Sequence, residues 1–171
     1  RVVARYFRRG GRPAGTPYRA LPMLRPDLGV EREELILAST FVEVYLAREG
    51  HDGAVGINLL TKIQLPTLAS LYGAMLAGVD FVLMGAGIPR EIPAVLDRLA
   101  LHSPVSLRLD VAGARDGEVE ELIFDPRLHG GADLRPLARP RFLAIVASNS
   151  LATLLARKAA GRVDGFVIEG P

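Results

Sequence analysis

The sequence predicts an α/β fold in which helices cover a parallel sheet. Short apolar runs alternate with helical stretches along most of the chain. The runs at 81–84 and 142–147 are almost continuously apolar, which is typical of strands buried on both faces. Residues 78–85 and 162–170 resemble each other, because both turn at Val-Asp, continue through an apolar strand and end at glycine. Repeated strand–helix units produce such an internal echo.

A different segment precedes these units. Residues 1–30 contain a short helical start and then a loop rich in glycine and proline. Residues 31–49 carry apolar side chains on one broad face, which predicts a helix that ends near Gly50. We therefore divide the chain into an N-terminal helical and loop segment, 1–50, and an α/β unit, 51–171.

The α/β unit is expected to contain its elements in a regular order. Strands are predicted at 54–59, 81–84, 142–147 and 166–169, and helices at 66–77, 90–101 and 150–160. Pro66 suits the first turn of its helix.

One stretch interrupts this order. Apolar and polar residues alternate over 105–111, a turn region follows at 113–117, and a second strand is predicted at 119–124. This pattern indicates a half-exposed β-hairpin, about 104–125, inserted between strand–helix units. Structural decoration or an oligomer contact is one interpretation of the hairpin, and a lid over a binding site is the other.

Composition limits the classes of function. Hydrophobic residues make up 49% of the chain and charged residues 23%, which excludes wholesale disorder. Cysteine is absent, so disulfide and thiolate chemistry are excluded, and we expect a cytoplasmic protein. The apolar stretch 65–89 is interrupted by four glycines and by Asp80, which favours a helix and a buried strand over a membrane span.

The chain begins with a basic tract. Seven arginines precede the first acidic residue, Asp27; they are Arg1, Arg5, Arg8, Arg9, Arg12, Arg19 and Arg25. Such a tract can bind nucleic acid or anionic surfaces. Nothing else in the chain resembles a nucleic-acid-binding module, so we interpret the tract as a solvated helix and loop and expect no nucleic-acid partner.

The chain is shorter than a complete (β/α)8 barrel. A complete (β/α)8 barrel needs about 250 residues, whereas this chain has 171. The first residue is Arg1 and the last residues read as the end of a strand. We therefore expect the chain to be part of a longer protein.

Familiar catalytic signatures are missing from the sequence. It contains no nucleophile elbow, no phosphate-binding Walker loop and no pair of histidines at zinc-ligand spacing, so no metal site is expected. The three histidines, His51, His102 and His129, fall in predicted loops or at element ends. We interpret them as surface residues rather than catalysts.

Ligands of parallel α/β folds bind at the carboxyl ends of the strands, which selects four places. Asn58 closes the first strand, and its amide offers both a donor and an acceptor. The small residues 85–87 let a planar ligand approach the backbone. Formation of tight turns is the alternative interpretation of both places.

The other two places follow later strands. Ser148 comes directly after the strand at 142–147, and the alternative interpretation is that Ser148 or Ser150 caps the next helix. Glu169, Gly170 and Pro171 follow the last strand, where a turn is the alternative.

Three stretches at these strand ends resemble the nitronate monooxygenase (2-nitropropane dioxygenase-like) family and the related flavin-dependent enoyl-acyl-carrier-protein reductases. Residues 55–59, VGINL, are similar to the family's GVN strand, and residues 85–89, GAGIP, to its GAGNP strand end. Residues 146–148 and 163–170 resemble its V.S…GADAVI.EG unit. The resemblance covers about residues 53–103 and 140–171, and Ile88 stands where the reductases have asparagine.

The resemblance implies a partial (β/α)8 TIM barrel with parallel strands, an inserted β-hairpin, and FMN at the C-terminal strand ends. By analogy, the FMN-binding residues are Asn58, Gly85, Ala86, Gly87, Ser148, Glu169 and Gly170. Lys62 and Gln64 lie just past Asn58, within reach of the flavin ring or phosphate. In the family the unit at 163–170 leads into an AGGH motif with the histidine that acts on substrate, so the catalytic histidine is expected beyond Pro171 and none of the residues here is assigned as catalytic.

The implied activity is FMN-dependent oxidation of a small molecule, an alkyl nitronate, by molecular oxygen. A homo-oligomer is compatible with this interpretation, and no membrane partner is expected. An FMN- and NAD(P)H-dependent enoyl-thioester reductase is the alternative enzyme. A non-catalytic half-barrel that serves in assembly is the alternative from another class. Because half of the expected site lies outside residues 1–171, we expect these residues alone to bind FMN poorly.

Overall fold

The computed structural model describes residues 1–170, except 19, 22, 28, 116–117 and 132–133. Arg19 of the basic tract, residues 116–117 of the predicted turn region and Pro171 lie outside the described residues. The helices are α1 (Val2–Tyr6), α2 (Val30–Ala47), α3 (Thr67–Leu76), α4 (Ile92–Ala100), the short 3-10 helix η1 (Pro126–His129) and α5 (Asn149–Lys158). The strands are β1 (Gly56–Leu60), β2 (Phe81–Gly85), β3 (Val105–Leu109), β4 (Glu120–Phe124), β5 (Arg141–Val146) and β6 (Gly165–Ile168).

The α/β prediction is confirmed by the main sheet. It contains four parallel strands in the order β1-β2-β5-β6, which is their order in the chain. Helices α3 and α5 connect β1 to β2 and β5 to β6, as crossovers between neighbouring parallel strands require. Within the described residues this sheet is open, with β1 and β6 at its edges.

The two faces of the sheet differ in burial. One face carries the buried Val82, Met84, Phe142 and Ala144, which belong to the same core cluster as the apolar side chains of α3 and α4. The apolar side chains that the structure describes on the opposite face lie outside this core cluster: Leu60 is 44% exposed, and Leu83, Leu143, Ile145 and Val167 are only half-buried. We call this second side the open face, and Asn58 lies on it.

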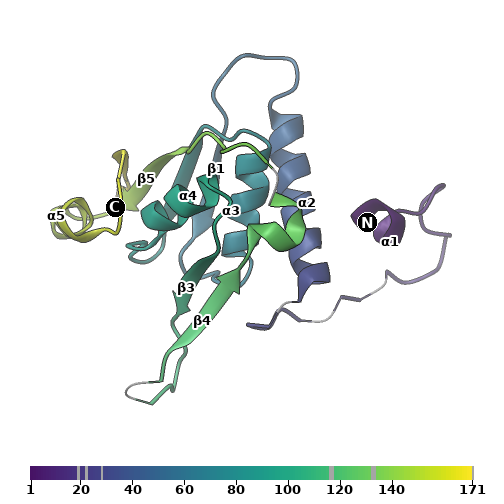
Figure 1. The fold of residues 1–171 in the computed structure, drawn as a ribbon, viewed down its shortest axis with the longest axis horizontal. Coiled ribbons are helices and arrows are strands. Elements are labelled where there is room, and N and C mark those ends of the chain that lie inside the picture. Colours follow the sequence, from purple (N-terminus) through teal and green to yellow (C-terminus); the bar gives the residue numbers. More distant parts are fainter. Residues whose placement is uncertain (19, 22, 28, 116–117, 132–133, 171) are drawn as a thin grey trace.

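Helix α3 lies at the centre of the helical layer, because α2 covers the side that faces away from the sheet (Figure 1). All residues from Thr67 to Met75 are buried. The two helices are in close contact at Gly73, where an added Cβ would lie 3.0 Å from the backbone carbon of Leu37. A residue with any side chain at position 73 would therefore force α2 and α3 apart.

The predicted hairpin is confirmed as an antiparallel pair of β3 and β4, which extends away from the sheet (Figure 1). Val105, Leu109, Leu122 and Phe124 are buried on one face, whereas Ile123 on the other face is 65% exposed. This alternation is the half-exposed pattern expected from the sequence.

The two similar segments, residues 78–85 and 162–170, each contain an aspartate with the same structural role. Asp80 and Asp164 each precede a strand and bind the start of the neighbouring one. The Oδ2 atom of Asp80 accepts a hydrogen bond of 2.8 Å from Val55 N, and that of Asp164 accepts one of 2.8 Å from Phe142 N. An arginine approaches each carboxylate, Arg48 at 2.7 Å and Arg139 at 2.6 Å. Each Val-Asp turn thus fixes the register of two adjacent strands.

Both carboxyl groups ionise more easily than a free aspartic acid. The hydrogen bond from Val55 N and the Arg48 guanidinium lower the pKa of Asp80. Burial acts to raise the pKa of Asp164, but the hydrogen bond from Phe142 N and the guanidinium groups of Arg139 and Arg162 outweigh it, so this pKa is also lowered. The charged forms therefore stabilise the folded chain.

This charge state predicts the pH dependence of stability. Because both pKa values are lower when folded, the stabilisation is fully present above the ordinary aspartate pKa of 3.8 and is lost as the pH falls below it. We expect the free energy of unfolding to fall between about pH 5 and pH 2, as measured by urea unfolding. A double variant, Asp80→Asn with Asp164→Asn, should show a shallower pH dependence, and an unchanged slope would contradict this assignment.

The N-terminal segment contacts the remainder through α2. Arg1 pairs with Glu34 at 3.1 Å and Arg5 with Glu31 at 3.0 Å, so two arginines of the basic tract are engaged in surface ion pairs within the chain. The apolar stretch 65–89 forms α3 and β2. Among the described residues, no helix combines the length and apolar character that a membrane crossing requires.

Candidate functional site

The carboxyl ends of the four parallel strands meet at one edge of the sheet. The register places Leu60 opposite Gly85, Met84 opposite Ala144, and Val146 opposite Ile168. Three of the four places selected from the sequence therefore lie at or after the ends of neighbouring strands at this edge, whereas Asn58 lies inside β1.

Asn58 lies on the open face near this edge, opposite Leu83 of β2. Its side chain is exposed and makes no hydrogen bond with any described residue. The turn interpretation does not account for it, since Asn58 lies inside β1 rather than after it. Its amide is available to a ligand with both donor and acceptor groups.

The glycines at 85 and 87 have reasons within the fold. A Cβ at Gly85 would lie 2.9 Å from Cβ of Ile145, and one at Gly87 would lie 2.8 Å from Cβ of Thr61. The Gly85 carbonyl accepts hydrogen bonds from both Thr61 N (2.9 Å) and Thr61 Oγ1 (2.8 Å), which ties the ends of β1 and β2 together. Thr61 was not selected from the sequence, and a single threonine after a strand carries no signal for this role.

Ala86 lies between these glycines with a positive φ of 56°. This conformation costs an alanine about 1 kcal/mol. Ala86 and Gly87 are exposed, so the strained backbone faces solvent at the edge where the strands end.

The residues that follow β5 and those that follow β6 have different roles. Ser148 caps α5, because its Oγ accepts a hydrogen bond of 3.2 Å from Leu151 N, in agreement with the capping interpretation. Glu169 and Gly170 are exposed, and the Glu169 side chain makes no hydrogen bond with a described residue. Glu169 N donates to Val146 O at 3.0 Å, which holds the residue at the end of β6 beside β5.

Lys62 and Gln64, which follow β1, differ in their contacts with the rest of the chain. Lys62 is exposed and has no partner among the described residues. The Gln64 amide binds the backbone of Asp110 in both directions, accepting from Asp110 N at 2.8 Å and donating to Asp110 O at 3.3 Å. Gln64 therefore anchors the hairpin.

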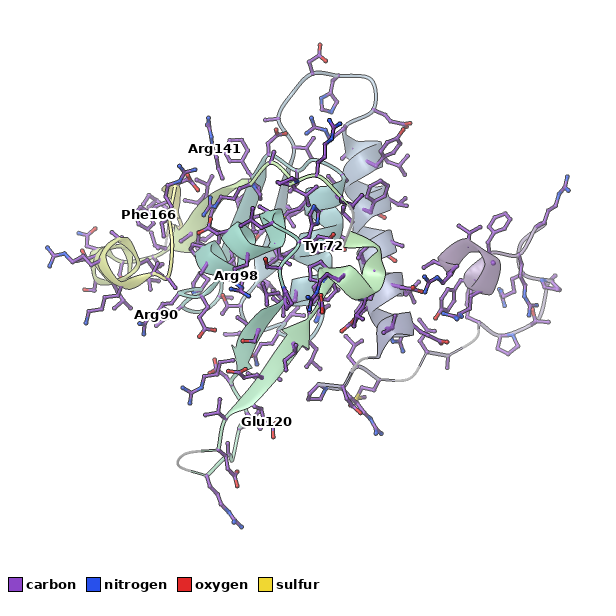
Figure 2. All side chains as sticks on the ribbon, viewed as in Figure 1. Tyr72, Arg90, Arg98, Glu120, Arg141 and Phe166 are labelled. Carbon is purple, nitrogen blue, oxygen red and sulfur yellow. The ribbon has the colours of Figure 1, made fainter. Side chains whose placement is uncertain are left out.

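The surface interpretation is wrong for two of the histidines. His102 is 6% exposed, and its Nδ1 lies 2.8 Å from the hydroxyl of Tyr72, in the interior of the molecule (Figure 2). Its Nε2 lies 2.8 Å from Arg135 O, so the ring donates to this carbonyl and accepts from Tyr72. Burial raises the pKa of Tyr72. This arrangement holds helix α3 against the loops on either side of the hairpin.

His129 is also buried, with a side chain that is only 2% exposed. Its Nε2 lies 2.8 Å from Glu33 Oε2, and its ring stacks on Phe124. No local pattern predicts these partners, because Tyr72 is 30 residues from His102 and Glu33 is 96 residues from His129. His51 is exposed, as expected.

The described part of the chain contains no group of three or more His, Cys, Asp or Glu side chains able to hold a metal ion. Comparisons with protein-family models, curated proteins and solved structures found no match. The side chains and exposed backbone near the carboxyl ends of the parallel strands are therefore the basis for a functional proposal.

Proposed function

We propose that the chain contributes the FMN site of an oxidoreductase, most closely an enzyme that oxidises alkyl nitronates with molecular oxygen. The observation that carries the proposal is the amide of Asn58, which is exposed on the open face of the edge strand β1 and forms no hydrogen bond with a described residue. The VGINL and GFVIEG stretches that resemble flavoenzymes of this class lie along β1 and β6, and GAGIP begins at the carboxyl end of β2.

The arrangement of the sheet supports a partial (β/α)8 barrel. The strands follow one another in chain order, as successive strands of such a barrel do, and the helices cover one face only. The open face then corresponds to the barrel interior, which further strands would cover. Phe166 and Ile168 of the edge strand β6 are 36% and 77% exposed, which leaves room for a neighbouring strand–helix unit of such a barrel.

The residues at the edge are compatible with a planar cofactor. Asn58 offers an amide to the polar edge of the isoalloxazine ring, and the exposed backbone of Ala86, Gly87 and Gly170 leaves room for close approach. Lys62 follows Asn58 by four residues and Glu169 precedes Gly170, and neither side chain forms a hydrogen bond or ion pair with a described residue. When bound, the flavin supplies the electron transfer, while these residues bind and orient it.

Asn58→Ala is expected to weaken FMN binding about tenfold, the loss that corresponds to about 1.4 kcal/mol of hydrogen bonding. The 171-residue chain is titrated with FMN, and binding is measured as quenching of the flavin fluorescence. Thr153→Ala is the control, because Thr153 is an exposed polar residue on α5 and makes no hydrogen bond with a described residue. Equal affinities for the parent chain and the Asn58 variant would reject this role.

The reaction is tested on the FMN-loaded longer protein, because the catalytic histidine is expected beyond Pro171. Oxygen uptake with an alkyl nitronate is expected, without oxidation of NADH in the presence of an enoyl thioester. A protein that binds no flavin at any concentration would instead favour a non-catalytic assembly role.

A further inference from the structure

A second site lies on the helix-covered side of the sheet, beyond the end of β2. It is a cavity of about 390 Å³ whose floor includes the buried Met84, Thr67 and Ile92. The hairpin forms one wall through Leu107 and Arg108, and the end of α5 forms another. The lining includes Thr61 and Ile88, which adjoin the strand end at residues 85–87, but it does not include Asn58 of the open face.

The walls of the cavity are fixed by hydrogen bonds between segments distant in sequence. Gln64 binds both backbone groups of Asp110, and Glu91 Oε2 accepts from Arg108 N at 3.3 Å, so the hairpin is attached to the loops after β1 and β2. On the other side, Ala160 N donates to Arg90 O at 2.8 Å. The cavity is thus formed before any ligand binds.

Three cationic side chains line this cavity: Arg90, Arg108 and Lys158. They come from the loop before α4, from β3 and from the end of α5, and Arg90 lies toward α5 in Figure 2. None of the three side chains forms an ion pair or hydrogen bond with a described residue. Arg139 shows the contrast, since its guanidinium binds both Asp97 and Asp164.

Two carboxylates share the lining and limit the attraction for anions. Glu91 is engaged with the hairpin backbone, whereas the Asp110 carboxylate makes no hydrogen bond with a described residue. Three cations and two carboxylates leave the lining with a net charge of +1. Like charges held around one cavity repel each other, and an anion placed between them relieves this repulsion.

We propose that this cavity binds a small phosphate ester, with its phosphate between Arg90, Arg108 and Lys158. Arginine forks and a lysine ammonium are the side chains that proteins use for phosphate oxygens. The apolar Ile88, Pro89 and Leu107 in the same lining provide a surface for the organic part of the molecule. The volume lies within the range of about 300–1,000 Å³ that is typical of small-molecule sites.

Phenyl phosphate is a suitable probe, titrated into the 171-residue chain by calorimetry at physiological ionic strength. Saturable binding is expected, and each of Arg90→Gln, Arg108→Gln and Lys158→Gln should weaken it about tenfold. Asp110→Asn should strengthen binding, because it removes a negative charge from the lining. Inorganic phosphate should bind about tenfold more weakly than phenyl phosphate, since it leaves the apolar wall uncovered.

Matched controls separate this site from general attraction to a basic surface. Arg157→Gln and Arg115→Gln remove the same charge from α5 and from the hairpin region outside the cavity lining, and should change affinity less than about twofold. Asn58→Ala should bind phenyl phosphate as the parent chain does, so the outcome is independent of the flavin proposal. Absence of saturable binding, or an equal loss in the control variants, would overturn the site. Equal affinity for inorganic phosphate would overturn the assignment of an ester.

Discussion

Asp164→Ala is expected to lower the free energy of unfolding by about 3 kcal/mol, because it removes one partner of a buried ion pair. The side chains of Asp164 and Arg139 are only 11% and 15% exposed. Without Asp164, the Arg139 guanidinium keeps Asp97 as a partner but loses its more buried one, and Phe142 N loses its acceptor. For a chain of this size the change corresponds to a decrease in Tm of about 6–12 °C.

Urea unfolding of three variants tests the origin of this effect. Asp164→Asn retains an oxygen for Phe142 N but loses the charge, so its loss of stability should be intermediate. Asp80→Ala should cost only about 1 kcal/mol, since that ion pair is more than a third exposed and is screened by solvent. Equal losses at positions 80 and 164 would contradict the role assigned to burial.

Gly73→Ala is expected to destabilise the chain by about 2 kcal/mol, within the range for overpacked cores. Helix propensity alone predicts the opposite, because alanine is favoured over glycine in a helix interior by about 1 kcal/mol. The added Cβ would contact the backbone of Leu37, which cannot move aside as a flexible side chain can. The sign of the change therefore reports directly on the contact between α2 and α3.

Thermal or urea unfolding of Gly73→Ala gives the sign. Gly170→Ala serves as the stability control, because a Cβ at that position meets no atom within 4 Å. Its effect is expected to stay within about 0.5 kcal/mol. An increase in stability at position 73 would show that the two helices are not in close contact there.

The sequence predicted the elements whose hydrophobic period is strong. The apolar run at 81–84 became β2, and the alternation over 105–111 and 119–124 became the hairpin. The Val-Asp echo was recognised as a repeat, but its function as a link between neighbouring strands was not. That function depends on Val55 and Phe142, which are brought to Asp80 and Asp164 only by the parallel register.

The site was harder to predict because its contacts are long-range. Asn58 was selected as the residue that closes the first strand, whereas it lies inside β1, and its amide forms no hydrogen bond with a described residue. Gly85 and Gly87 were selected as ligand-facing, yet their lack of a side chain is already required by Ile145 and Thr61. Arg90, Arg108 and Lys158 were missed, since isolated basic residues on separate elements have no recognisable spacing.

The agreement between strand order and chain order bears on how this protein is made. Each new parallel strand joins the edge left by its predecessor, so β1 and β2 can pair while later residues are still in the ribosome. The hairpin separates β2 from β5 in the chain. Its strand β3 pairs with the next strand, β4, rather than with the free edge of β2. Stepwise growth at one edge lets each new strand pair with the strand that precedes it in the sheet, which limits mispairing during synthesis.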